Sequence, residues 1–351
     1  MTGADPRESG IDSVHLWAHE GILRSVPDAQ WLVKHEVEEC RKSILRQLWW
    51  QYATLPRLMD KHRCGLIFNT DAGSVCPSPR SAAMSQDMLS FEPGEMQRYG
   101  FSRARLRLEL LRGIQGRTLR RSRLAIFLTE YARKIVTSVI GRLERSVVIP
   151  HGVDESFLRD CRVEAESTNR RVTNLVYVSN AAPYKHQWNI IEASHRLRQD
   201  NVAVRLSLVG AGHGASRERV RQAILRFDPK GEFVTLTGKV RHEDVASHLD
   251  AADVFVYASS CENMPVTLLE GMAAALPICC SDRGPMPEVL GDCGGYFDPE
   301  DVGSIVNCLR QVVESADLRD RWRRDARRRA SLFTWHGCSR NTWQELAKVC
   351  D

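Results

Sequence analysis

The stretch Asp253–Ser281, DVFVYASSCENMPVTLLEGMAAALPICCS, decides the fold. It predicts a short apolar strand, a helix that begins near Pro265, and a second apolar strand. Short apolar strands joined by helices are typical of a parallel sheet that is covered on both faces. One residue does not fit this pattern, because Glu270 lies in the middle of an apolar helix, where carboxylates rarely occur without a partner.

The same alternation of strands and helices extends from about Val172 to Phe297. The predicted strands are 174–179, 202–210, 233–238, 253–259, 277–281 and 294–297, and the predicted helices include 185–199, 217–227, 242–252 and 266–275. This order predicts a doubly wound domain, which binds ligands beyond the carboxyl ends of its strands. Its first predicted helix, Lys185–Gln199, has apolar Trp188, Ile191 and Leu197 on one face.

The first half of the chain shows the same alternation less clearly. Its strand candidates are 14–17, 31–33, 65–69, 81–85, 124–129 and 146–150, with helices expected around 36–62, 102–122 and 130–141. The segment Ile149–Phe157 and the polar run 162–171 are expected to form the hinge between two domains. The last helix, near Trp335–Val349, is expected to cross back onto the first domain.

Composition limits the possible classes of protein. The 351 residues are 43% hydrophobic and 26% charged, without a long apolar run or a signal peptide. The 11 cysteines include no C-x-x-C pair, so we expect reduced, mostly structural thiols and a cytoplasmic location. The net charge of +5 arises entirely within residues 1–160, which favours an anionic partner for that half.

Three charged side chains are candidates for binding a nucleotide. The N–H groups of Asn263–Thr267 open a helix and could bind phosphate, and Glu270 lies where ribose hydroxyls would follow. Glu262 would face whatever is attached beyond the phosphates. Lys185 follows a predicted strand and could neutralise the charge of a departing phosphate. Taken alone, Glu270 fits an ordinary buried ion pair better, Glu262 fits a charge that complements the helix dipole, and Lys185 fits a surface residue. The glycines of LVGAGHG (208–214) do not have the spacing of a dinucleotide fingerprint.

Taken together, these motifs resemble the donor site of the retaining group 1 glycosyltransferases (family 4), which have the GT-B fold. Glu262 and Glu270 lie in Ser259–Asp301 at the spacing of that family's E-x7-E motif. The segments PYKHQ (183–187), LTGKV (236–240) and VIPHGVD (148–154) also match, and MSQDMLSFEP (84–93) and AIFLTEYA (125–132) match more loosely.

The resemblance implies an α/β chain with two Rossmann-like, doubly wound domains that face a cleft. Residues 1–152 would form the acceptor-side domain, 153–334 the nucleotide-sugar donor domain, and 335–351 a helix that returns to the first domain. Lys185 would contact the diphosphate, Glu270 the ribose and Glu262 the sugar. The full set of expected donor-binding residues is Asn180, Lys185, Gly210, Gly238, Val240, Glu262, Asn263, Met264, Pro265, Val266, Thr267 and Glu270.

The resemblance further implies transfer with retention of anomeric configuration and without a metal or other cofactor, and the chain has no D-x-D motif. Two positions depart from the family pattern. Asn180 replaces the usual arginine before the lysine, and Gln86-Asp87 stands where many members have His-Asp. Lys185, Glu262 and Asp87 are therefore the expected catalytic residues. The assignment of Asp87 has the least support, because the histidine that precedes it in many members is Gln86 here.

The expected partners are a nucleotide-diphosphate sugar and a glycan or lipid-linked acceptor. The basic segment Arg103–Arg123 holds eight arginines and one acid, and Leu106, Leu110, Leu111 and Ile114 recur in it at helical spacing. This helix could dock on an anionic membrane surface, which would make the protein peripheral at the inner face of the membrane, or it could be a solvated arginine face over a core stripe. Nothing in the segment indicates nucleic acid.

Two alternatives remain open from the sequence. The chain could be a catalytically silent relative that serves as a binding or scaffold subunit, or a related epimerase or phosphorylase. The family's first domain usually opens with a strand, a glycine turn and a helix, whereas only 13 residues, most of them polar, precede Val14 here. We therefore expect either that Met1 is an internal start or that this member has lost the opening unit, and in both cases that the first domain is less stable than the second.

Overall fold

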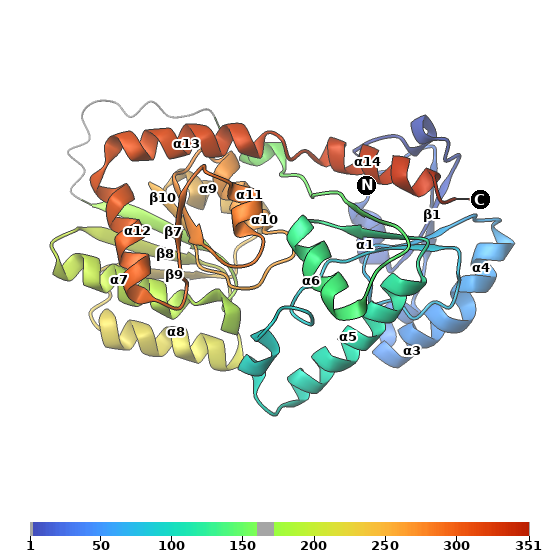
Figure 1. Ribbon diagram of the computed structural model, residues 1–351, viewed down its shortest axis with the longest axis horizontal. Coiled ribbons are helices and arrows are strands. Elements are labelled where there is room, and N and C mark those ends of the chain that lie inside the picture. Colours follow the sequence, from blue (N-terminus) through green and yellow to red (C-terminus); the bar gives the residue numbers. More distant parts are fainter. Residues whose placement is uncertain (1–2, 160–171, 351) are drawn as a thin grey trace. The chain divides into compact units, whose positions relative to one another are not determined.

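The computed structural model describes residues 3–159 and 172–350, and it divides the chain into two compact units. The first unit consists of Met1–Gly152 together with Thr334–Asp351, and the second consists of Val153–Phe333 (Figure 1). The polar run 162–171, predicted as part of the hinge, lies outside the described residues. No helix in the described ranges is both long and apolar enough to cross a bilayer.

The second unit is built on one parallel sheet of six strands, as the alternation of apolar runs predicted. Its order is β12-β11-β10-β7-β8-β9. The strands are β7 (Thr173–Val178), β8 (Val204–Val209), β9 (Val234–Gly238), β10 (Val254–Tyr257), β11 (Ile278–Ser281) and β12 (Gly295–Phe297). Every residue of β10 and β11 is buried, which is typical of a parallel strand with both faces covered.

The helices of the second unit cover both faces of this sheet. They are α7 (Gln187–Gln199), α8 (Gly214–Phe227), α9 (His242–Asp250), α10 (Val266–Ala273), α11 (Met286–Leu290), α12 (Val302–Glu314) and α13 (Ala316–Ala330). Helix α7 packs against α8 and α12, while α10 packs against α13 (Figure 1). A helix that connects two parallel strands forms a right-handed crossover. The helices therefore cover one face of the sheet while successive strands are added on one side of β7, and the opposite face once strands are added on its other side.

The first unit contains two separate parallel sheets rather than one. β1 (Val14–Ala18) pairs with β2 (Leu32–Glu36), and the other sheet has the order β3-β4-β5-β6. Those four strands are β3 (Ile67–Asn69), β4 (Ser81–Met84), β5 (Leu124–Phe127) and β6 (Ser146–Val148). Each strand predicted from the sequence for this half is present. In the larger sheet the described strands lie side by side in chain order, so the chain crosses that sheet in one direction only.

The single helix expected around 36–62 is interrupted. The structure has α2 (Glu39–Lys42), α3 (Ile44–Trp49), a π-helical turn (Trp50–Thr54) and α4 (Leu55–Lys61), preceded by α1 (Glu20–Ser25). The other helices of the unit are α5 (Arg103–Arg121), α6 (Glu130–Ile140) and α14 (Trp335–Ala347).

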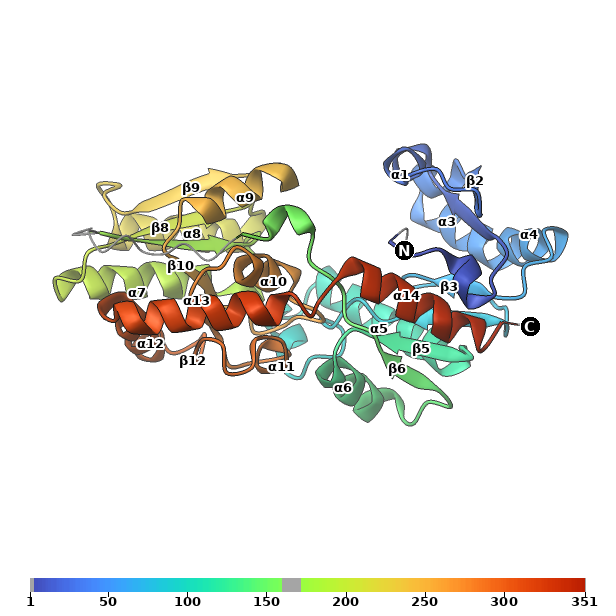
Figure 2. The same cartoon turned by 90° about the horizontal axis from the view of Figure 1, so that it is seen from above.

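Helix α14 joins the two sheets of the first unit (Figure 2). Trp343 on this helix meets the ring of Trp31, which precedes β2, edge-on at a centroid distance of 6.1 Å. Further along the helix, Glu345 forms an ion pair of 3.2 Å with Arg145, next to β6. The chain therefore returns from the second unit to complete the first.

The face that α5 buries differs from the sequence prediction. Leu108, Gln115, Gly116 and Leu119 are buried, whereas Leu106 and Leu110 of the predicted apolar stripe are each 62% exposed. Leucines occur around most of this helix, so spacing alone did not select the packed face. The buried face includes a glycine that lets Ile140 of α6 approach, since a Cβ at Gly116 would lie 3.0 Å from that side chain.

Substitution by alanine is expected to have opposite effects on stability at two glycines that lie within helices. Gly113 in α5 has open space where a Cβ would stand, whereas a Cβ at Gly271 in α10 would lie 2.7 Å from the Phe255 ring. We expect Gly113→Ala to stabilise the protein by about 1 kcal/mol, because alanine favours helices over glycine. We expect Gly271→Ala to destabilise it by about 1–3 kcal/mol through overpacking. Urea denaturation followed by circular dichroism measures both, and a stabilising Gly271→Ala would show that the ring contact imposes no constraint.

Candidate active site

The strand order of the second unit reverses between β7 and β10. From β7 the chain moves outward through β8 and β9, and it then returns to the other side of β7 and continues through β10, β11 and β12. β7 and β10 are direct neighbours, with Val254 opposite Leu175. The connections that leave their carboxyl ends run in opposite directions, and such a point is where doubly wound sheets bind ligands.

Lys185 follows β7 at this point, and it is a buried residue. It ends a 3-10 turn, Pro183–Lys185, and α7 begins only at Gln187, so the prediction that Lys185 opens that helix was wrong. His186 between them has φ of +45°, a left-handed conformation that turns the chain into the helix. The Tyr177 hydroxyl donates to the Lys185 carbonyl at 2.8 Å and fixes this turn against β7.

The ammonium group of Lys185 contacts the carboxylate of Glu262, which follows β10. The side chains of Lys185 and Glu262 are only 9% and 16% exposed. Lys185 Nζ also donates to the Tyr257 hydroxyl at 3.3 Å, and Ser259 Oγ donates to Glu262 Oε1 at 2.5 Å. The structure thus brings together the two residues that the sequence assigned separately to the phosphates and the sugar.

Tyr257 and its neighbour Tyr177 form the buried wall behind this pair. Their rings meet edge-on at 5.8 Å, and Lys185 Nζ lies 5.2 Å from the centroid of Tyr257. Burial raises the pKa of both phenols well above the ordinary value, and the Glu262 carboxylate raises it further. Both hydroxyls therefore stay neutral at physiological pH and keep their protons for hydrogen bonding.

Glu270 is buried on α10 and has a histidine as its partner. Its Oε1 lies 2.9 Å from Nε2 of His242, the first residue of α9. Burial raises the pKa of the Glu270 carboxyl, and the hydrogen bond from His242 opposes this effect. The His242 side chain is 70% exposed, so solvent reaches the pair from one side.

The tip of α10 lies beside Glu262. The helix begins at Val266, where the predicted helix 266–275 begins, and Pro265 is its N-cap. Asn263, Met264 and Pro265 are buried, whereas Val266 and Thr267 are partly exposed. The Val266 N–H already donates to the Met264 carbonyl at 2.9 Å, so the phosphate-binding role predicted for this segment rests on the other N–H groups of the first turn.

The turns after β7, β8 and β9 are packed tightly against one another. The Gly210 N–H donates to the Gly238 carbonyl at 3.1 Å, and both glycines have positive φ. A Cβ at Gly210 would lie 2.4 Å from the Ser179 carbonyl oxygen, so only glycine fits there. Asn180 is exposed and Val240 is partly exposed at the same edge of the sheet.

The first unit places Asp87 after the carboxyl end of β4. Asp87 Oδ1 accepts the Leu89 N–H at 2.9 Å, and the Gln86 amide donates to the Thr70 carbonyl at 2.7 Å. Burial raises the pKa of Asp87. The structure therefore shows an ordered carboxylate at the end of a parallel strand, within the first unit alone.

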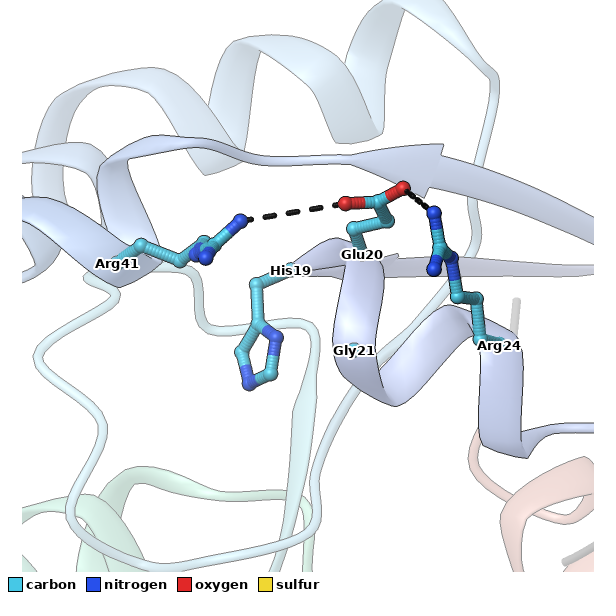
Figure 3. Close-up of a pocket in the computed structure, with 5 residues that line it drawn as sticks. All are labelled: His19, Glu20, Gly21, Arg24 and Arg41. Atoms are coloured by element: carbon cyan, nitrogen blue, oxygen red, sulfur yellow. Dashed lines mark hydrogen bonds and ion pairs between the residues drawn. The ribbon is translucent and has the colours of Figure 1, made fainter.

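The first unit also has a pocket of about 440 Å³ next to α1. It is lined by His19, Glu20, Gly21, Arg24 and Arg41 (Figure 3). Glu20 pairs with Arg24 and lies 4.0 Å from Arg41, and the His19 ring points away from its carboxylate. None of the residues predicted for the donor site lines this pocket.

Three residues that the sequence did not single out contact the predicted ones. Tyr257 and Ser259 contact the Lys185–Glu262 pair, and His242 contacts Glu270. Tyr257 and Ser259 lie at the carboxyl end of β10, a position that could have identified them. His242 had no comparable signal, because its contact depends on how α9 packs beside α10.

Comparison with known proteins identifies the class. Residues 164–329 match the family described as "Glycosyl transferases group 1", which confirms the resemblance recognised from the motifs. O-antigen chain mannosyltransferase B of Escherichia coli is 28% identical over 171 residues, which are 48% of this chain and 44% of that protein. The matches to this relative and to the next cover only about half of each relative's length.

Solved structures confirm the GT-B fold. A sucrose-phosphate synthase from Thermosynechococcus elongatus superposes with a TM-score of 0.74 at 16% identity, over 92% of this chain and 84% of that chain. Anabaena Alr3699/HepE, solved in complex with UDP and glucose, has a TM-score of 0.70 at 17% identity, over 98% and 93% of the two chains.

The buried carboxyl of Glu92, close to Asp87 in the sequence, should make the free energy of unfolding depend on pH. Burial raises the pKa of Glu92 to about 7, although the Tyr131 hydroxyl donates to its Oε1 at 2.5 Å. Between pH 4.5 and 7 the folded state holds a proton that the unfolded state has lost, so stability falls as the pH rises through this window. As the pH rises from 4 to 8, we expect the free energy of unfolding of Glu92→Gln to increase by about 3 kcal/mol relative to that of wild type, because glutamine has no proton to lose. Urea denaturation at the two pH values measures this, and parallel pH profiles would contradict it.

Proposed function

We propose that this protein is a glycosyltransferase that moves a sugar from a nucleotide-diphosphate-sugar donor to an acceptor with retention of anomeric configuration. The observation that carries the proposal is the buried Lys185–Glu262 pair at the reversal point of the second sheet. Lysine with a carboxylate could be purely structural, but this pair lies where doubly wound sheets bind ligands, in a domain of the group 1 family.

In this proposal the donor exchanges partners with the pair. The diphosphate takes the place of the Glu262 carboxylate beside the Lys185 ammonium, and Glu262 then accepts hydrogen bonds from hydroxyls of the sugar. Both side chains are already held in place, Lys185 by the Tyr257 hydroxyl and Glu262 by Ser259. Once the diphosphate has displaced Glu262, these remaining contacts keep Lys185 oriented toward the leaving group, which favours electrostatic stabilisation of the charge that develops there.

The proposed transfer breaks the bond between the anomeric carbon and the phosphate oxygen and forms the new glycosidic bond on the same face of the sugar. The acceptor hydroxyl gives its proton to the departing phosphate, and Lys185 neutralises the charge that develops there. We propose that this reaction uses no metal, because Lys185 supplies the cation and the chain has no D-x-D motif.

Further contacts to the donor are proposed from the same edge of the sheet. Glu270 would bind the ribose hydroxyls, and the first turn of α10 would bind phosphate oxygens. Gly210, Gly238 and Val240 would line the base. Asn180 carries no charge, so diphosphate binding would depend more on Lys185 than in relatives with an arginine at that position. Asp87 is the proposed contribution of the first unit to the chemistry.

A glycan or lipid-linked acceptor is supported by the names of the relatives, such as the O-antigen chain mannosyltransferase and a phosphatidylinositol dimannoside mannosyltransferase of Mycobacterium tuberculosis. We propose that the protein works at the cytoplasmic face of a membrane, and α5 supplies the reason. Leu106 and Leu110 in its N-terminal half and Phe101 just before it are exposed, beside the exposed Arg103 and Arg107. Apolar and basic side chains together are suited to an anionic lipid surface.

The C-terminal half of α5 is less suited to this role. Arg120, Arg121 and Arg123 donate to the carbonyl groups of Ile140, Pro77 and Val349, so these side chains hold the first unit together. The proposed membrane surface is therefore limited to residues 101–110.

The donor site can be tested by calorimetric titration after a thermal-shift screen against UDP-, GDP- and ADP-sugars. We expect one donor class to stabilise the wild type and Glu270→Ala to weaken its binding at least tenfold, because the hydrogen bonds of a carboxylate are lost. The control is Glu243→Ala, which removes an exposed glutamate of α9 that pairs with Arg241.

The outcome also separates a catalyst from a silent relative. A productive donor should give a product whose anomeric configuration, read by nuclear magnetic resonance, is that of the donor. Unchanged donor affinity in Glu270→Ala together with a lower melting temperature would instead make the Glu270–His242 pair structural. Donor binding without any transfer would favour the binding subunit.

The membrane surface can be tested by sedimentation with vesicles. We expect the protein to bind vesicles that contain anionic phospholipid, with an affinity that falls as salt rises, and to bind neutral vesicles weakly. Leu106→Ser with Leu110→Ser should reduce binding severalfold, because inserted apolar area is lost. The control, Leu225→Ser with Leu332→Ser, removes two leucines that are 52% and 75% exposed in the second unit. Equal loss in both double variants would argue against α5 as the docking surface.

A further inference from the structure

Three histidines of the first unit converge from three different elements. His15 lies on β1, His35 lies on β2, and His62 follows the last residue of α4 as its C-cap. In the parallel register of the two strands His15 is opposite Val33 and Trp17 is opposite His35. Side chains alternate along a strand, so His15, Trp17 and His35 share the face of the pair that meets α4. Figure 2 shows β2 and α4 in the same part of this unit.

The ring nitrogens of these histidines are close enough to share one ion. One nitrogen from each ring lies within 4.8 Å of the other two, and His15 Nδ1 is 2.8 Å from His35 Nε2. The His62 ring lies 4.8 Å from that of His15 and 4.9 Å from that of His35, measured between centroids. All three side chains are partly buried, so an ion could enter from solvent.

Stacking alone could explain part of this arrangement. Trp17 stacks on His35 at 5.1 Å and on His15 at 5.6 Å, and it packs against the core formed by Val37, Trp50, Leu55, Met59 and Ile67. Stacking does not require the nitrogen of a third imidazole to point at the other two.

We propose that His15, His35 and His62 bind a divalent transition-metal ion of the zinc type, with three imidazole nitrogens and a fourth position open to water. Imidazole is a preferred ligand of Zn²⁺, and sites with three protein ligands keep the fourth position open. With Zn–N bonds of about 2.0–2.1 Å, tetrahedral ligands lie roughly 3.3 Å apart. The His15 and His35 nitrogens need to separate by about half an ångström and the third nitrogen to approach by at most about 1.5 Å, which side-chain rotation supplies.

The ion would add a second link between the β1–β2 pair and the helices, beside the packing of Trp17 against the core. β1 and β2 form a sheet of only two strands, and such a pair has little stability without further packing. A metal held by both strands and by the end of α4 would fasten this pair to the interrupted helices of residues 39–61. The site uses none of the residues proposed for the donor, so it stands or falls independently of the proposed transfer.

The test uses the full chain without a histidine tag, freed of metal by chelation. We expect titration with Zn²⁺ to show one equivalent bound, and the melting temperature to rise with the ion. Co²⁺ in place of Zn²⁺ should give the visible absorption bands of a tetrahedral site. The variants are His15→Gln, His35→Gln and His62→Gln, each checked for folding by circular dichroism. The control is His19→Gln, a histidine of the same unit whose ring lies in the α1 pocket (Figure 3).

We expect each of the three variants to lose at least tenfold in Zn²⁺ affinity and to lose the cobalt bands, while His19→Gln binds as the wild type does. A wild type that takes up no stoichiometric Zn²⁺ would overturn the proposal. It would also be overturned if the folded variants retained wild-type affinity and spectra, because the stack would then be structural only.

Discussion

A buried ammonium and a buried carboxylate meet where the strand order of the second unit reverses. Removing two ions from water costs several kcal/mol for each, and the attraction between them repays this only when further hydrogen bonds are present. Tyr257 and Ser259 supply such bonds to Lys185 and Glu262. Lys185 and Glu262 meet because they follow β7 and β10, which are neighbouring strands. These strands are neighbours because the chain returns to the other side of β7 after β9.

This dependence explains which parts of the site were predictable. Both residues were identified from the sequence, because each follows an apolar strand and Glu262 has the spacing of a known motif. Their mutual contact was not predicted, because it depends on a strand order that no local pattern encodes. Lys185 was also expected to open a helix, whereas the left-handed conformation of His186 separates it from α7.

The first unit was less predictable for a physical reason. Its strands were found, but β1 and β2 form a sheet of their own, and pairing depends on contacts between segments far apart in sequence. In α5, leucines lie on several faces, and the packed face includes Gln115 and Gly116 rather than Leu106 and Leu110. The cluster of His15, His35 and His62 has no motif spacing at all, because each histidine comes from a different element.

The return of α14 to the first unit bears on the order in which the protein folds during synthesis. Domains generally fold as the chain emerges, beginning from the N-terminus. Here the first unit lacks the partner of Trp31 and Arg145 until Trp343 and Glu345 have been made, and these follow the whole of the second unit. The second unit, which is continuous in sequence, can close its sheet earlier. The half of the protein that the ribosome makes first is therefore the half that is finished last.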